Sequence, residues 1–213
     1  VCTLLLLPMS GLLEKMAYKL VPDSKLPEKA SELDDRLLTT PAIALECAHH
    51  LTYDMAKIAT DALKSSIECL GSYDKSKAEA IREAEDKTDH FEDIIGSYLV
   101  KLSMRQLNET EGAMASMLLK AIGDFERISD HAVNILESAE EMREKGIVFS
   151  EGAKAEMDSL CAATNEIVTL SYSAFVENNA EQANLVEPLE QVIDRMKELL
   201  RTRHIDRLRI GEC

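Results

Sequence analysis

Apolar residues recur every three or four positions along most of this 213-residue chain, a pattern that predicts long amphipathic helices. Interruptions at Gly71, Gly146 and Asn178-Asn179, together with a new helix start at Asn108, divide the chain after residue 40 into five segments. We expect helices at about 41–70, 74–104, 108–145, 150–177 and 180–207. Long helices joined by short loops form antiparallel bundles, so the predicted fold class is all-α.

Each predicted helix has an apolar stripe that should face a core. The stripe is clearest on the third helix: Met114, Leu118, Ala121, Phe125, Ile128, Ala132, Ile135, Ala139 and Met142. Asn108 and Glu111 form a capping box at the start of that helix. Pro188 falls within the first turns of the fifth helix, where we expect a late start or a bend.

One acidic pair recurs along the chain with an i, i+4 spacing, which stacks two like charges on one helix face. Three copies occur, namely Glu85 and Asp89 in EDKTD, Glu126 and Asp130 in ERISD, and Glu190 and Asp194 in EQVID. The first and last are 105 positions apart (190 − 85), which predicts duplicated helical units. A partner for the third helix would begin near residue 214, so we expect the second unit to lack its last helix.

These carboxylates have two interpretations. If the second and third helices pack antiparallel, four of them face each other across a groove: Glu85, Asp89, Glu126 and Asp130. Oxygen ligands suit hard cations, iron or manganese. Alternatively, they are ordinary charged helix edges that pair with Lys87 and Arg127. Spacing alone slightly favours the second interpretation.

Other candidate chemistry is sparse. Glu46 and His49 form an ExxH pair like those of di-iron bundles, but such bundles need two pairs and we find one. We interpret His49, His50 and His90 as surface or helix-packing residues, and His131 as structural or as orienting the preceding aspartate. No GxSxG, Gly-rich phosphate loop or HExxH occurs. We therefore expect no catalytic residues and no enzyme activity.

The net charge of −15 argues against nucleic acid as a partner, because phosphate binding needs a basic surface. The five cysteines are scattered and predict free thiols in a reducing compartment. Residues 1–13 are strongly apolar and are followed by lysines, so we expect residues 1–20 to end a transmembrane helix, with the next part on the cytoplasmic side. A short buried helix is the alternative. Residues 21–40, with two prolines in 21–30, are predicted to be a linker.

Several segments together resemble a known family. DFERISDHAVNI, residues 124–135, resembles the signature of PhoU-type phosphate-regulatory domains, and EDKTD and EQVID resemble its middle-helix motif. LDDRLLTTPAIALECA and the preceding LLLLPMSGLLEKMAYKLVPD are similar to the junction between the last transmembrane helix and the cytoplasmic PhoU-like domain of bacterial sodium/phosphate cotransporters. RHIDRLRIGEC, residues 203–213, resembles the turn into the final helix.

The resemblance implies two tandem three-helix bundles: a first PhoU-like repeat at residues 41–147 and a second at 148–213 that lacks its last helix. It also implies metal ligands, with iron, zinc or manganese as the metal. Glu85, Asp89, Glu126 and Asp130 would form one site, and Glu190 and Asp194 would form half of a second. Ser129 stands where the family usually has glycine.

The function implied is that of a cytoplasmic regulatory domain of a sodium-dependent phosphate transporter at the cell membrane, controlling phosphate uptake or export. Its expected partners are the transporter membrane domain and metal ions, and a homodimer is left open. Three alternatives stay open at this point. They are a free-standing PhoU-type signalling adaptor, a metal-storage or redox bundle, and a structural bundle whose acidic motifs bind nothing.

Overall fold

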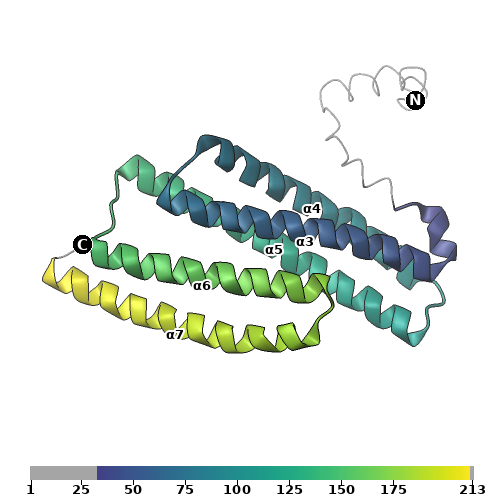
Figure 1. Ribbon diagram of the computed structural model, residues 1–213. Coiled ribbons are helices and arrows are strands. Elements are labelled where there is room, and N and C mark those ends of the chain that lie inside the picture. Colours follow the sequence, from purple (N-terminus) through teal and green to yellow (C-terminus); the bar gives the residue numbers. More distant parts are fainter. Residues whose placement is uncertain (1–32, 212–213) are drawn as a thin grey trace, which may run out of the picture. The chain divides into compact units, whose positions relative to one another are not determined.

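The computed structural model describes residues 33–211, which are almost entirely helical and contain no strand. The elements are η3 (Asp35–Thr39), α3 (Pro41–Gly71), α4 (Lys75–Ser103), α5 (Glu109–Lys145), α6 (Glu151–Val176) and α7 (Ala180–Ile210) (Figure 1). The predicted all-α fold is confirmed. Within these residues, no helix combines the length and the apolar character that crossing a bilayer requires. Residues 1–20, predicted to end a transmembrane helix, lie outside the described part of the chain.

Local capping explains why the helices begin and end where the sequence predicts. The Asn108 side chain accepts from the Glu111 N–H at 2.9 Å, and the Glu111 carboxylate accepts from the Asn108 N–H at 2.9 Å. Gly146 ends α5 in the left-handed conformation, with φ of 62°. Asn179 caps α7, which begins at Ala180 and continues through Pro188, so a late start is wrong.

The three helices α3, α4 and α5 pack on one another as an antiparallel bundle. Its core consists of fully or almost fully buried side chains from all three helices, among them Leu51, Met55, Ile81, Phe91, Ile95, Leu99, Leu118 and Leu136. Hydrophobic burial on this scale is the main stabilising force of a helical bundle. The first bundle therefore holds nearly all of the described core.

The buried face of α5 contains Leu118, Phe125, Ala132 and Ala139 of the predicted stripe but extends beyond it. Met114, expected to face the core, is exposed, whereas Ala115, Ile122, Ser129 and Leu136 are buried. Because α5 packs against both α3 and α4, its buried arc is wider than a single stripe and includes a polar position. Ser129 is 1% exposed, and its hydroxyl has no hydrogen-bond partner within the described residues.

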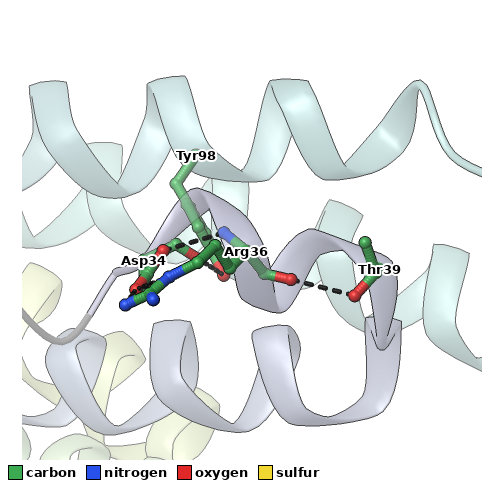
Figure 2. A network of polar contacts seen from close by, with 4 residues as sticks. All are labelled: Asp34, Arg36, Thr39 and Tyr98. Carbon is green, nitrogen blue, oxygen red and sulfur yellow. Dashed lines mark hydrogen bonds and ion pairs between the residues drawn. The ribbon is translucent and has the colours of Figure 1, made fainter.

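The described end of the predicted linker, residues 33–40, forms η3 and packs against the first bundle (Figure 2). The Asp34 carboxylate accepts from the Arg36 backbone N–H at 2.8 Å and from its Nε–H at 2.7 Å. The Tyr98 hydroxyl of α4 donates to the Asp34 carbonyl at 3.4 Å, and Leu38 is buried. These contacts make η3 an ordered part of the bundle.

The helices α6 and α7 form a hairpin that is far less buried. Ala174 is the single buried residue of α6, and α7 has none. The hairpin reaches the first bundle through α6, which packs on α3 and places Tyr172 and Phe175 against its core. Phe175 contacts the rings of Phe125 and Tyr53, with centroids 5.1 Å and 5.3 Å away.

Helix ends reproduce the period found in the acidic motifs. The last residue of α6 lies 105 positions after the last residue of α3 (176 − 71), and α7 begins 105 positions after α4 (180 − 75). The capping residues Asp74 and Asn179 are separated by the same interval. The hairpin α6–α7 is therefore equivalent, element by element, to α3–α4.

Candidate metal centre

The interface between α4 and α5 brings together four of the six predicted ligands. These consecutive antiparallel helices pack on each other here, and the Ile122 side chain of α5 lies at an ordinary van der Waals distance, 3.5 Å, from a Cβ built at Gly96 of α4. Two turns away from this contact, Glu85 and Asp89 of α4 lie on the side that faces Glu126 and Asp130 of α5. Glu85 is close enough to Asp130, and Glu126 to Asp89, for each pair of carboxylates to repel across the interface.

Burial is the largest cause that raises the pKa of the Glu126 carboxyl above its ordinary value of 4.5, followed by repulsion from Asp130. Glu92 and Asp89 of α4 add to this shift. Burial likewise comes first in raising the pKa of Glu85, ahead of repulsion from Asp86, Asp130 and Asp89. Carboxylates of both helices therefore contribute to the raised pKa values of Glu85 and Glu126.

Glu92 belongs to this cluster, although sequence reasoning did not select it. Its carboxylate oxygen would lie 3.6 Å from a Cβ added at Gly123 of α5, so it reaches across the interface. A signal for it was present, because Glu92 follows Glu85 by seven residues and thus lies on the same helix face. The predicted ligands were chosen as pairs four residues apart, and this criterion does not select Glu92.

Cations from the protein do not neutralise the cluster. Within residues 33–211, none of the four predicted ligands on α4 and α5 forms an ion pair. Lys87, proposed above as a counter-charge, lies 4.0 Å from Glu83 instead. Arg127 makes no ion pair with any described residue. The simple alternative of paired helix edges is therefore not what the structure contains at this interface.

The donor set fits a hard cation chemically, since it consists of carboxylate oxygens without a counter-charge. The side chains are nevertheless spread along the interface: among the described residues, no three His, Cys, Asp or Glu side chains are placed to hold one ion together. A bound cation would require carboxylates of both helices to turn toward it. Glu85 and Glu126 are half-buried and Asp89 and Asp130 exposed, so the two aspartates have room to do so.

The remaining predicted ligands lie apart from this cluster. Glu190 and Asp194 are exposed on α7, and Asp194 pairs with Lys197 at 2.7 Å. Among the described elements α7 packs on α6, which brings no second acidic pair to them. Of the ExxH pair, Glu46 is exposed, and His49 packs on the Tyr53 ring with centroids 4.2 Å apart. Burial lowers the pKa of His49, which fits the predicted packing role.

The raised pKa values of Glu85 and Glu126 give a first prediction, about pH. Folding raises both pKa values above 4.5, so these two carboxyls bind protons more tightly in the folded state than in the unfolded state. Their protonation therefore stabilises the fold at low pH, and this contribution to the free energy of unfolding is lost as the pH rises through the raised pKa values. We expect the double variant E85Q/E126Q to melt higher than the parent at pH 7. Thermal unfolding between pH 4 and 7 should show this advantage shrinking toward pH 4.

A matched control is E166Q/E187Q, which removes two charges from exposed positions of α6 and α7. It reduces the net negative charge by the same amount but leaves the α4–α5 interface unchanged. If the control gains as much melting temperature at pH 7 as E85Q/E126Q, general charge repulsion accounts for the effect and the local cluster does not.

Comparison with known proteins adds a family likeness to this geometry. The PhoU domain family matches residues 52–139, which include all four acidic residues of the α4–α5 interface. The phosphate-specific transport system accessory protein PhoU homolog 1 of Thermotoga maritima is 26% identical over 160 residues, covering 74% of this chain and 67% of that protein. No solved structure matches the chain. The chain is thus similar to PhoU domains over the α3–α5 bundle and distantly similar to a PhoU homolog over most of its length.

Proposed function

We propose that this protein regulates phosphate transport and that a metal ion bound between α4 and α5 stabilises its active form. The observation that carries the proposal is the set of carboxylates on the two facing helices, Glu85 and Asp89 with Glu126 and Asp130. Burial, and then repulsion from the neighbouring carboxylates, raises the pKa values of Glu85 and Glu126, and none of the four forms an ion pair within the described residues. The segment that matches the PhoU domain family contains all four. Iron, zinc and manganese are the candidate metals.

Regulation would act through packing and not through catalysis. Neutralising the carboxylates removes repulsion between two long helices and so stiffens the first bundle. The partner we propose is the membrane domain of a sodium-dependent phosphate transporter, which this domain would contact from the cytoplasmic side. The similarity of residues 4–23 and 33–48 to the junction of such transporters supports this choice.

The metal part of the proposal predicts a ligand-dependent melting temperature, the second prediction. A cation that binds only the folded state raises the melting temperature with its concentration. We expect manganese, ferrous iron or zinc to do so, and calcium less if the site is compact. The variant D89N/D130N keeps side-chain size and removes two charges. It should lose the metal-dependent shift while melting no lower than the parent in the absence of metal.

The matched control is D124N/D158N, which removes two exposed aspartates of α5 and α6 outside the cluster. This control should keep the full metal-dependent shift. A full shift in D89N/D130N would mean that the metal binds elsewhere or that the carboxylates are solvated helix edges. In that outcome the metal role proposed here fails, whereas a role in phosphate transport could still be tested in cells.

A free-standing regulatory adaptor is a second candidate, and the likeness to an accessory protein of a phosphate-specific transport system favours it. Phosphate uptake in cells that lack this protein distinguishes the two. If uptake changes in sodium medium and not when potassium replaces sodium, the sodium-dependent transporter is the target. If uptake changes equally in both media, the adaptor function is correct. Unchanged uptake in both media contradicts the two candidates together.

A further inference from the structure

One buried hydroxyl of the first bundle lacks the partner that its counterparts have. The buried polar residues within 33–211 are Thr52, Thr60, Ser66, Thr88 and Ser129. The first four each donate a hydrogen bond to a carbonyl three or four residues earlier in the same helix, at 2.8 or 2.9 Å. Ser129 is 1% exposed, and its hydroxyl has no hydrogen-bond partner among the described residues. Because a buried polar group without a partner is costly, this hydroxyl requires an explanation.

The packing of α4 on α5 places Ser129 at the level of the acidic cluster. The Ile122 side chain of α5 lies 3.5 Å from a Cβ built at Gly96 of α4, so these two positions face each other. Ser129 follows Ile122 by seven residues, and Asp89 precedes Gly96 by seven residues. Seven residues make about two helical turns, so each lies in the same row as the contacting residue of its own helix. Because the two helices are antiparallel, both steps lead in one direction, and Ser129 comes to lie opposite Asp89.

The two acidic motifs of this interface share a buried hydroxyl at the same position. Thr88 precedes the aspartate of EDKTD and Ser129 precedes that of ERISD, whereas EQVID of α7 has Ile193 there. The Thr88 hydroxyl is already used, because it donates to the Glu85 carbonyl at 2.9 Å. Ser129 stands where the PhoU family that this motif resembles usually has glycine, so its hydroxyl is a feature of this chain. Of the two hydroxyls, that of Ser129 is the one available to a carboxylate.

The carboxylates around Ser129 need the kind of donor that it supplies. Glu126 precedes it by three residues, Asp130 follows it directly, and Asp89 lies opposite on α4. Ionised carboxylates accept hydrogen bonds and cannot donate them, so they cannot satisfy one another. A hydrogen bond from a hydroxyl to a charged carboxylate is stronger than one to a neutral acceptor. Asp89 is exposed in this structure, and its carboxylate would reach Ser129 by turning into the interface.

We propose that Ser129 is a positioning residue of the cation site between α4 and α5, whose hydroxyl donates a hydrogen bond to the Asp89 carboxylate when that side chain turns inward. This inference rests on the proposed function, because a cation between the two helices is what draws Asp89 inward. The hydroxyl then gains the partner that it lacks here, and the carboxylate is held in its binding orientation. Outer hydrogen bonds of this kind typically contribute about 10–100-fold to metal affinity.

The experiment compares manganese binding and metal-free stability in the full chain with and without this hydroxyl. S129A should raise the manganese dissociation constant, measured by titration calorimetry, by about 10-fold. Its melting temperature without metal should be no lower than that of the parent, because no paired hydrogen bond is lost. S66A is the matched control: Ser66 is 0% exposed, and its hydroxyl is paired with the Leu63 carbonyl of α3 at 2.8 Å. This control should bind manganese as tightly as the parent does.

A hydroxyl that serves only the fold would give the opposite pattern. S129A would then melt lower than the parent without metal and bind manganese with unchanged affinity, which overturns the inference. An equal loss of affinity in S66A overturns it too, because any buried hydroxyl would then have the same effect. The parent chain separates this failure from that of the proposed function. If the parent binds no manganese, the proposed metal role fails and the role of Ser129 fails with it, whereas tight binding by both the parent and S129A overturns the role of Ser129 alone.

Discussion

Replacing Leu51 by alanine should lower the free energy of unfolding by about 3–4 kcal/mol, one of the largest effects of any single change in this chain. Leu51 is 0% exposed in α3, where it lies in the core that all three helices of the first bundle share. Alanine would remove its buried apolar surface and leave a cavity that rigid neighbours fill poorly. Urea unfolding measured by circular dichroism gives the change directly.

The matched variant L200A should cost no more than about 1 kcal/mol, because Leu200 is half-buried in a two-helix hairpin that can adjust. The same contrast predicts faster amide hydrogen exchange in α6 and α7 than in α3–α5, since locally weak units open first. Equal costs for L51A and L200A, or equal protection in both halves, would show that the hairpin is as firmly packed as the bundle.

The sequence predicted the helices well because their ends carry strong local signals. Asn108 with Glu111, Ser150 and Gly146 each act at one residue, and the structure uses all of them as predicted. The buried face of a helix was predicted less well than its ends, because it depends on apolar residues spread along the whole helix. The predicted α5 stripe began at Met114, which is exposed, because apolar residues occupy two adjoining rows of that helix and only contact with α3 and α4 together decides which positions are buried.

The short helix η3 shows another limit. The sequence before Pro41 contains prolines and mixed charges, which indicate a linker up to residue 40. The Asp34 cap and the contact with Tyr98 instead order residues 33–39 against the bundle. That second contact joins residues 64 positions apart, so no local pattern could have revealed it.

The sequence predicted four acidic residues of the candidate site but not the full set of residues or the arrangement of their side chains. Helix spacing predicted Glu85 and Asp89 to lie opposite Glu126 and Asp130, and repulsion between Glu85 and Asp130 and between Glu126 and Asp89 fits that arrangement. Two facts needed the structure: Glu92 joins the cluster, and the side chains are spread along the interface without converging on one point. Side-chain directions depend on packing around each residue, which the spacing of charges along a helix does not encode.

Replacing Phe175 by alanine should detach the hairpin from the first bundle, at a cost of about 2–3 kcal/mol. Its ring lies against Phe125 and Tyr53 with centroid distances of 5.1 Å and 5.3 Å, and it is packed on the core that α3, α4 and α5 share. Exchange protection should fall in α6 and α7 and stay unchanged in α3–α5. F149A is the matched control, because Phe149 is 36% exposed in the loop before α6.

The imidazole of His49 gives F175A a second, independent readout. The Phe175 ring lies 6.3 Å from the His49 ring, and burial is the main reason that the pKa of His49 is below its ordinary value of 6.5. If the hairpin detaches, solvent reaches the imidazole and its pKa should rise toward 6.5, as an NMR titration of the ring protons would record. A pKa that does not move, together with unchanged exchange in α6, would mean that the hairpin is held by contacts other than this aromatic group. The effect of F175A would then be only the loss of one partly buried ring.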